Sequence, residues 1–183
     1  MVFHGIGYLS RYFLPYFDAL NPEENFIVAP QAPSKYYLDK SYRHIGASWL
    51  TREDTAKETD NILNYINAVY QEVNIPPDSR LIVFGYSQGV SVAARWVARN
   101  RIVCEQLVLY AGGMPEELEA ADFHFLQDHT RITFLVGDTD EFLSPGRMER
   151  ESSKIDTLFG GKAEIRIFKG GHEIQKTLIN NLV

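Results

Sequence analysis

The chain has 183 residues, of which 45% are hydrophobic and 23% charged, and its formal net charge is −6. These values are ordinary for a globular protein, and the length fits one domain with a core of its own. An acidic chain without clustered Lys and Arg is poorly suited to neutralise phosphates, so we expect no nucleic-acid partner. No apolar run approaches the roughly 18 residues that a membrane span needs, so we expect no integral membrane segment.

The number of cysteines and the first residues of the sequence bear on the cellular compartment of the protein. Cys104 is the only cysteine, which excludes a disulfide within the chain. It lies in the apolar stretch RIVCEQLVLY, so we expect it in or near the core rather than as a reactive thiol. The sequence does not open with the charged and then apolar pattern of a secretory leader, and we therefore expect a cytoplasmic protein.

Short apolar runs recur along the chain and predict strands. In chain order they are residues 26–30, 81–85, 106–112, 132–137 and 164–168. The first four are almost continuously apolar, which is typical of parallel strands covered on both faces. In the last run, Glu164 and Arg166 alternate with Ile165 and Ile167, and this alternation indicates a position closer to the edge of the sheet.

Segments with helical periodicity separate these runs. They are residues 55–73, 88–100, 146–159 and 173–182. The alternation of strands and helices predicts an α/β fold with a mostly parallel central sheet flanked by helices, and we expect residues 1–183 to form a single domain. Residues 31–54 and 113–130 lack periodicity, and loops of this length in a small domain usually carry function.

The run that ends at Gly85 continues as GYSQG and then enters an Ala-rich helix. A strand-to-helix turn of the type Gly-x-Ser-x-Gly is a nucleophile elbow, in which the serine sits on a strained turn above the carboxyl edge of the sheet. The sequence therefore predicts Ser87 as a nucleophile. The N–H of Gln88 comes at the start of the helix, where negative charge is stabilised, so it is a candidate oxyanion donor.

A serine nucleophile needs a histidine base. In α/β folds with a nucleophile elbow, the triad residues follow the chain order Ser, then Asp or Glu, then His. His172 follows the last predicted strand, so it lies at the same sheet edge as Ser87, and two glycines before it give its loop freedom to move. The other histidines come before the candidate acids in the chain: His4, His44, His124 and His129.

The acid of the triad has three candidates, all directly after the strand 132–137. Asp138 is the first residue after the glycine, a position whose side chain usually caps the turn itself. Asp140 is two residues further on and is expected to point back toward the histidine loop. We favour Asp140, with Asp138 as the alternative and Glu141 as the third choice.

Taken together, several motifs give the chain a family likeness. It resembles the phospholipase/carboxylesterase group of α/β-hydrolases, which includes the acyl-protein thioesterases. The matching pieces span nearly the whole chain: FHGIG (3–7), FIVAPQAP (26–33), ASWL (47–50), GYSQG (85–89), GDTDEFLSP (137–145) and GGHEI (170–174). The likeness implies a small α/β-hydrolase fold. No long helical insertion follows QLVLYAGG (106–113), so we expect no large cap domain.

The resemblance also implies roles for individual residues. Ser87 would be the nucleophile, Asp140 the acid and His172 the base. The backbone N–H groups of Ile6 and Gln88 would form the oxyanion hole. No metal or other cofactor is implied.

Two features of the sequence depart from the pattern of this group. Only Met1, Val2 and Phe3 precede the His-Gly motif, so we expect the N-terminal edge strands to be missing or short. Tyr8 stands where an acidic residue often follows the second glycine, which bears on substrate preference. His4 would have a structural role beside the oxyanion loop.

Aromatic and apolar side chains gather in the loops that we expect at the binding edge. Such side chains predict an apolar pocket for an acyl chain, although plain packing of the loops onto the sheet is the alternative for each of them. The candidates are Tyr36, Tyr37, Trp49, Met114, Phe142 and Leu143.

The sequence thus predicts a serine hydrolase of the carboxylesterase, lysophospholipase or thioesterase type that acts on a small-molecule ester or thioester. An acyltransferase or a perhydrolase would use the same triad, and a binding module without catalysis could use the same scaffold. A dienelactone-type hydrolase would need Cys at position 87, where the chain has Ser. A homodimer is left open.

Overall fold

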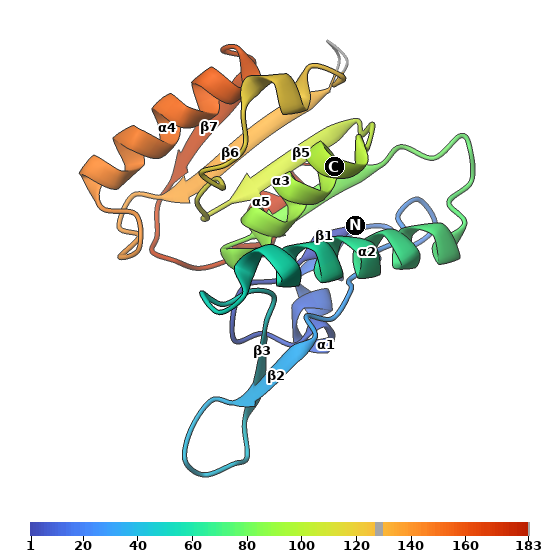
Figure 1. The fold of residues 1–183 in the computed structure, drawn as a ribbon, viewed down its shortest axis with the longest axis vertical. Helices are drawn as coiled ribbons and strands as arrows, with labels where there is room; N and C mark the ends of the chain where they lie inside the picture. The colour runs from blue at the N-terminus through green and yellow to red at the C-terminus, as the bar shows by residue number, and fades with distance from the viewer. Residues whose placement is uncertain (127–129, 183) are drawn as a thin grey trace.

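The computed structural model describes residues 1–126 and 130–182. Within these ranges, five strands form one sheet in the order β1-β4-β5-β6-β7, and every pairing in it is parallel (Figure 1). The strands are β1 (Val2–Phe3), β4 (Ile82–Tyr86), β5 (Gln106–Tyr110), β6 (Arg131–Gly137) and β7 (Ala163–Phe168). Since all five run the same way, their carboxyl ends meet at one edge of the sheet.

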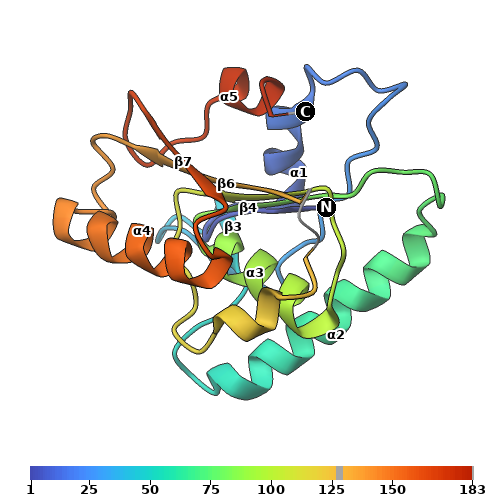
Figure 2. The same cartoon turned by 90° about the horizontal axis from the view of Figure 1, so that it is seen from above.

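Helices cover both faces of the sheet, as Figure 2 shows. One face carries α2 (Thr55–Val73), α3 (Gln88–Asn100) and α4 (Pro145–Phe159), and the other carries α1 (Ser10–Phe13) and α5 (Lys176–Asn180). Two short 3₁₀ helices, η1 (Leu14–Phe17) and η2 (Ala120–Phe123), complete the helical elements of the described ranges. This coverage explains why the central strands are apolar on both sides.

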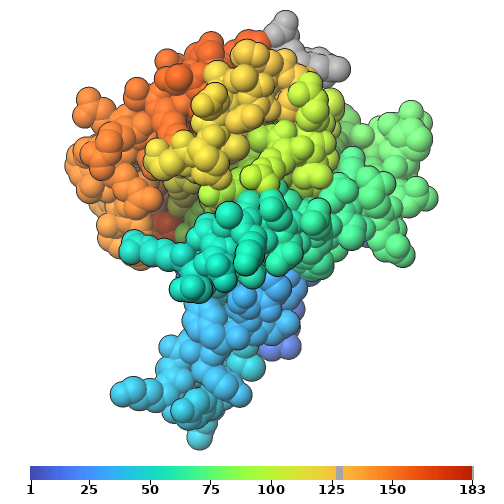
Figure 3. Space-filling model, in the orientation of Figure 1, coloured from blue at the N-terminus to red at the C-terminus, as the bar shows by residue number. Residues whose placement is uncertain are grey.

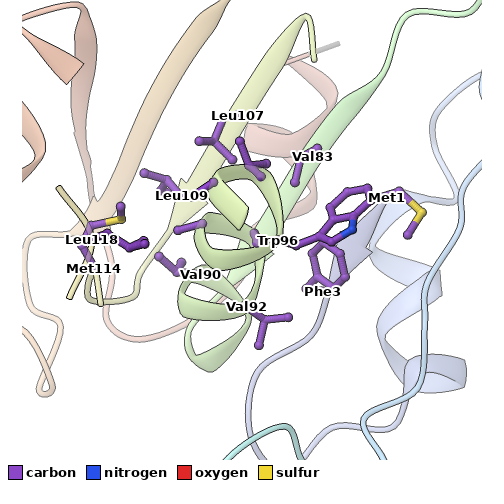
Figure 4. Close-up of a cluster of buried hydrophobic side chains, with 14 of the residues drawn as sticks. Met1, Phe3, Val83, Val90, Val92, Trp96, Leu107, Leu109, Met114 and Leu118 are labelled. Atoms are coloured by element: carbon purple, nitrogen blue, oxygen red, sulfur yellow. The ribbon is translucent and has the colours of Figure 1, made fainter. Parts of the chain in front are cut away.

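The larger core lies between the sheet and α3. Figure 4 shows Trp96 of α3 against Phe3 of β1, with the leucines of β5 beside the same helix. The ring centroids of Trp96 and Phe3 are 5.8 Å apart, and both side chains are fully buried. Cys104 is buried as well, which confirms its predicted place in the core.

Four predicted strands and all four predicted helices are confirmed, with small shifts at their ends. Helices α2 and α3 have the predicted bounds, and β7 is an edge strand as its alternation indicated. The last helix is shorter than the predicted 173–182, because residues 170–175 form the loop that carries His172.

The strand predicted at 26–30 is wrong. This segment is not part of a ladder, although the N–H of Val2 donates to the carbonyl of Val28 over 2.8 Å. The physical reason is the length of β1, which has only two residues and gives a neighbour almost no backbone to pair with. The expectation of short N-terminal edge strands agrees with this two-residue β1 at the sheet edge.

The segment 31–54, expected to be irregular, contains an antiparallel hairpin. Strands β2 (Ser34–Tyr37) and β3 (Ile45–Ser48) pair in the register Ser34 with Ser48 and Tyr37 with Ile45. Residues 34–45 of the hairpin are exposed and protrude from the body of the protein (Figures 1 and 3), and we call them the arm, whereas Ala47 and Ser48 of β3 are buried. Because both faces of β2 are exposed, its sequence shows no alternation from which a strand could be predicted.

Candidate active site

Ser87 sits on a strained turn between β4 and α3. Its backbone has φ 53° and ψ −117°, a region that non-glycine residues rarely adopt. The flanking glycines make the turn possible, since a Cβ on Gly89 would lie 2.1 Å from the carbonyl oxygen of Phe3, and one on Gly85 would lie 2.4 Å from that of Gly89. The sequence GYSQG therefore lifts the serine above the sheet edge.

The structure brings Ser87, His172 and Asp140 together. The Nε2 atom of His172 is 2.9 Å from Oγ of Ser87, and its Nδ1 is 2.8 Å from Oδ2 of Asp140. Asp140 follows β6 and His172 follows β7, so all three residues lie at the carboxyl ends of parallel strands. The Asp140 side chain is fully buried and that of His172 is 14% exposed.

These partners also fix the protons on the imidazole. An ionised carboxylate only accepts hydrogen bonds, so Nδ1 of His172 carries the proton and donates to Asp140. Nε2 is then the unprotonated nitrogen and accepts from the hydroxyl of Ser87. This is the arrangement that a general base requires.

The two neighbouring aspartates have different surroundings. The carboxylate of Asp138 pairs with the ammonium of Lys169 and accepts the N–H of Gly170, and these contacts hold its pKa below the usual value. Asp140 instead accepts the N–H of Phe142 over 2.8 Å with one oxygen and faces His172 with the other. Glu141 is exposed.

The two candidate oxyanion donors lie beside the serine. Gln88 is the first residue of α3, so its N–H has no acceptor inside the helix, and the helix terminus favours negative charge there. Ile6 lies in the loop after β1, and among the described residues its N–H has no acceptor. Both residues line the pocket that opens at Ser87.

His4 holds the loop that carries Ile6 in place. This side chain is fully buried, with Nδ1 2.8 Å from the carbonyl of Gly5 and Nε2 accepting the N–H of Ala32 over 3.1 Å. Burial lowers the pKa of His4, which favours the neutral imidazole that both contacts need. The main chain of the loop is fixed further by a hydrogen bond from the N–H of Gly7 to the carbonyl of Ala47.

The side chain of Gln88 holds a second loop in place. Its Nε2 donates to the carbonyl of Leu50 over 2.7 Å and to Oγ of Ser48 over 3.0 Å. Its Oε1 accepts the N–H of Trp49 over 2.8 Å. Gln88 thus lines the pocket, and its side chain holds residues 48–50 in place.

The remaining histidines lie away from the triad or outside the described residues. His44 is exposed on the arm, where its Nδ1 is 2.8 Å from Asp39. His124 is exposed at the end of η2. His129 lies outside the described residues. The chain-order argument against these histidines therefore agrees with the positions of His44 and His124.

An open pocket of about 710 Å³ surrounds Ser87 and His172. Of the residues expected in a substrate pocket, Met114, Phe142 and Leu143 line it. The prediction is wrong for Tyr36 and Tyr37, which lie exposed on the arm. It is also wrong for Trp49.

Trp49 belongs to the core instead of the pocket. The side chain is 1% exposed, and its Nε1 donates to the carbonyl of His4 over 2.9 Å. Its ring packs edge-on against Phe3 with centroids 5.8 Å apart. The indole therefore supports the start of the loop that carries Ile6.

Several pocket residues were not predicted from the sequence. They include Leu50, Arg95, Arg147 and Glu151. Glu151 of α4 accepts the N–H of Met114 over 2.9 Å, and Arg147, one helical turn earlier, donates to the carbonyl of Phe142 over 2.8 Å. The i, i+4 spacing of this pair was visible in the sequence, but it is equally typical of an exposed helix face.

Within residues 1–126 and 130–182, no three His, Cys, Asp or Glu side chains are grouped so that they could hold a metal ion. No helix in the part of the chain described here is both long and apolar enough to cross a membrane.

Comparison with solved structures defines the fold. The chain is similar to acyl-protein thioesterase 2 of Zea mays, with 13% identity over 99% of this chain and 88% of the other and a TM-score of 0.66. It is similar to a phospholipase/carboxylesterase of Dyadobacter fermentans, with 20% identity over 98% and 86% and a TM-score of 0.65. Esterase PE8 matches with 20% identity over 100% and 91% and a TM-score of 0.66.

These likenesses establish that the chain has the α/β-hydrolase fold. In the described ranges it has no large cap inserted above the sheet. No protein-family model matches the sequence, and no curated protein matches it either.

Proposed function

We propose that this protein is a serine hydrolase that cleaves carboxylic ester or thioester bonds through an acyl-enzyme intermediate. The observation that carries the proposal is the unbroken series of contacts from Oγ of Ser87 through the imidazole of His172 to the carboxylate of Asp140. Three residues that lie far apart in the chain meet in one geometry, at the sheet edge where open α/β folds bind ligands. The solved structures of the same fold include esterases and a thioesterase, which supports the proposal.

In the first half of the reaction, the hydroxyl of Ser87 attacks the carbonyl carbon of the substrate. Nε2 of His172 takes the proton from the hydroxyl, which makes the oxygen nucleophilic. The proton then passes from Nε2 to the departing alcohol or thiol. Asp140 keeps the imidazole in the required tautomer and stabilises its charged form.

The negative charge that forms on the carbonyl oxygen needs donors that are already in place. The N–H groups of Ile6 and Gln88 serve as these donors. Because His4 and the Gln88 side chain fix the surrounding loops, the two N–H groups need not reorganise as the charge develops.

In the second half, water attacks the acyl-enzyme, and His172 acts as base for the water and then returns the proton to Ser87. The pocket opens widely to solvent and its wall includes Met114, Phe142 and Leu143. An apolar wall of this kind suits an acyl chain. No step requires a metal or an organic cofactor.

The proposal is tested with p-nitrophenyl esters and acyl thioesters of increasing chain length. We expect turnover of at least one class by the wild-type protein, and a loss of about 10³-fold or more in Ser87→Ala. Ser153→Ala, a serine on the exposed face of α4, is the matched control and should keep wild-type turnover. Turnover in Ser87→Ala within a few-fold of wild type would rule out the assignment.

The same assays separate the rival functions. Adding alcohols or hydrogen peroxide and measuring how the acyl group partitions identifies an acyltransferase or a perhydrolase. A binding module would show no turnover in any of these assays, although it would fold and bind.

A further inference from the structure

Two tyrosines end the neighbouring strands β4 and β5 on the face that carries α1 and α5. Tyr86 and Tyr110 are direct partners in the ladder, and their ring centroids are 5.7 Å apart. Both side chains are buried, at 3% and 0% exposure. A buried tyrosine hydroxyl usually has a hydrogen-bond partner.

Both hydroxyls reach the loop that carries the histidine. The Oη of Tyr86 donates to the main-chain carbonyl of His172 over 2.9 Å. The Oη of Tyr110 accepts the N–H of Gln175 over 3.1 Å. The loop is therefore tied to the sheet at His172 itself and again three residues later. Burial raises the pKa of the Tyr86 hydroxyl, so it keeps the proton that it donates.

The ring of Tyr86 also contacts the imidazole. The centroids of Tyr86 and His172 are 5.4 Å apart at an interplanar angle of 30°, and Phe142 lies edge-on to the imidazole at 4.7 Å. The imidazole is thus in contact with two aromatic rings, and one of them belongs to the residue directly before Ser87. The same strand end positions the nucleophile and holds the base.

The loop needs such ties because it has little structure of its own. Residues 169–175 belong to no helix or strand, and Gly170 has φ 149°. On the side of the acid, the loop is held by the N–H of Gly170, which donates to Asp138, and by the Gly170 carbonyl, which accepts the N–H of Thr139. On the side of the serine, the tyrosine hydroxyls provide the corresponding contacts.

We propose that Tyr86, supported by Tyr110, is a positioning residue that sets the approach of His172 to Ser87. This inference rests on the proposed function, since it concerns how the base reaches the nucleophile. Removing the Tyr86 hydroxyl leaves the carbonyl of His172 without its donor and lets the loop sample positions in which Nε2 lies farther from Oγ. Small displacements of a base weaken catalysis strongly. Tyr86 also lines the pocket, so the test variant has to keep its ring.

The test is the rate at which a fluorophosphonate labels Ser87, which needs no knowledge of the natural substrate. Tyr86→Phe keeps the ring and deletes only the hydroxyl. We expect labelling to slow about 5- to 20-fold and kcat for the best ester to fall by a similar factor, with KM within about two-fold of wild type. Tyr110→Phe should slow labelling by about two- to five-fold, because its tie is three residues from the base.

The matched control is Tyr16→Phe, whose hydroxyl lies 3.4 Å from that of Tyr8 and makes no contact with the histidine loop. We expect wild-type labelling from it. Equal labelling rates for Tyr86→Phe and wild type would overturn the positioning role while leaving the serine hydrolase intact. An unlabelled wild-type protein would overturn both.

The melting temperature separates positioning from loss of fold. If Tyr86→Phe does not fold, Tyr110→Phe decides the question: slower labelling by the folded variant supports the proposal, and an unchanged rate overturns it. A rise in KM without a fall in kcat would also overturn it, since that result would assign the hydroxyl to the pocket.

Discussion

Nδ1 of His172 lies 2.8 Å from Oδ2 of Asp140. Asp138, two residues earlier in the chain, has different partners. The carboxylate of Asp138 pairs with the ammonium of Lys169 and accepts a hydrogen bond from the N–H of Gly170. The loop after β6 therefore divides its two carboxylates between different tasks. One faces the imidazole and the other fixes the backbone of the histidine loop.

This division predicts that the same substitution has a large effect on activity at Asp140 and a small effect at Asp138. Asp140→Asn should lower kcat/KM by about 10³-fold or more, because the amide no longer selects the tautomer in which Nε2 accepts a proton. Asp138→Asn keeps an acceptor for Gly170 and should stay within about ten-fold of wild type. Steady-state kinetics on one ester measures both variants, and the reverse order of effects would assign the acid to Asp138.

The side chain of Gln88 should matter for stability more than for reactivity. Gln88→Ala removes the partners of Ser48, Trp49 and Leu50, and we expect the free energy of unfolding to fall by about 2–4 kcal/mol. The backbone N–H remains, so the serine should still react with fluorophosphonate. Urea unfolding measures the change. Ser91→Ala, which removes one hydrogen bond within α3, should cost less than about 1 kcal/mol, and an equal cost for the two variants would contradict the anchoring role.

His4 should make folding stability depend on pH. Its pKa is lowered by burial from 6.5, so the unfolded chain binds a proton more readily than the folded protein does. The stability is then fully present above pH 6.5 and declines as the pH falls below it, by at most about 1.4 kcal/mol per pH unit. We expect urea unfolding at pH 7.5 and 5.5 to show this decline.

Two variants test whether His4 is the source of the decline. His4→Gln should be less stable at both pH values but should lose less stability between them. His44→Gln, a change in an exposed side chain, should keep the wild-type difference. If His4→Gln loses as much stability as wild type between the two pH values, another group is responsible.

Cys104 should be inert in the folded protein. The side chain is 3% exposed, and burial raises the pKa of its thiol to about 12. At pH 8 the fraction of thiolate is then roughly 10³ smaller than in the unfolded chain, and access is blocked as well. A thiol-reactive chromogenic disulfide should therefore react only after urea is added. Rapid reaction without urea would show that this part of the core opens readily.

The sequence was most informative where burial and backbone strain restrict the choice of residues. The apolar runs of β4, β5 and β6 are typical of strands covered on both faces, and Gly85 and Gly89 stand where a tight turn leaves no room for a Cβ. Given these strands, the chain order predicted that His172 and the candidate acids lie at the same edge of the sheet as Ser87. Local patterns were sufficient there because each one reports a physical constraint.

The arm and the pocket could not be predicted in the same way. The strand β2 is exposed on both faces, so nothing in its sequence separates it from a loop. Trp49 looked like a pocket residue because it lies in a loop, but a hydrogen bond to the carbonyl of His4 draws it into the core. The Tyr86 hydroxyl was also missed, since its acceptor lies 86 positions away in the chain. Such contacts depend on the path of loops, which the sequence pattern does not encode.

We propose the hydroxyl of Ser87, activated by His172, as the reactive nucleophile of this protein. The most direct measurement is mass spectrometry of the folded protein after treatment with a fluorophosphonate. We expect a single adduct on the peptide that contains Ser87 and none in Ser87→Ala. Labelling of His172→Ala should be slower by about 10²-fold or more. A folded wild-type protein that remains unlabelled, or an adduct on any other residue, would contradict this account.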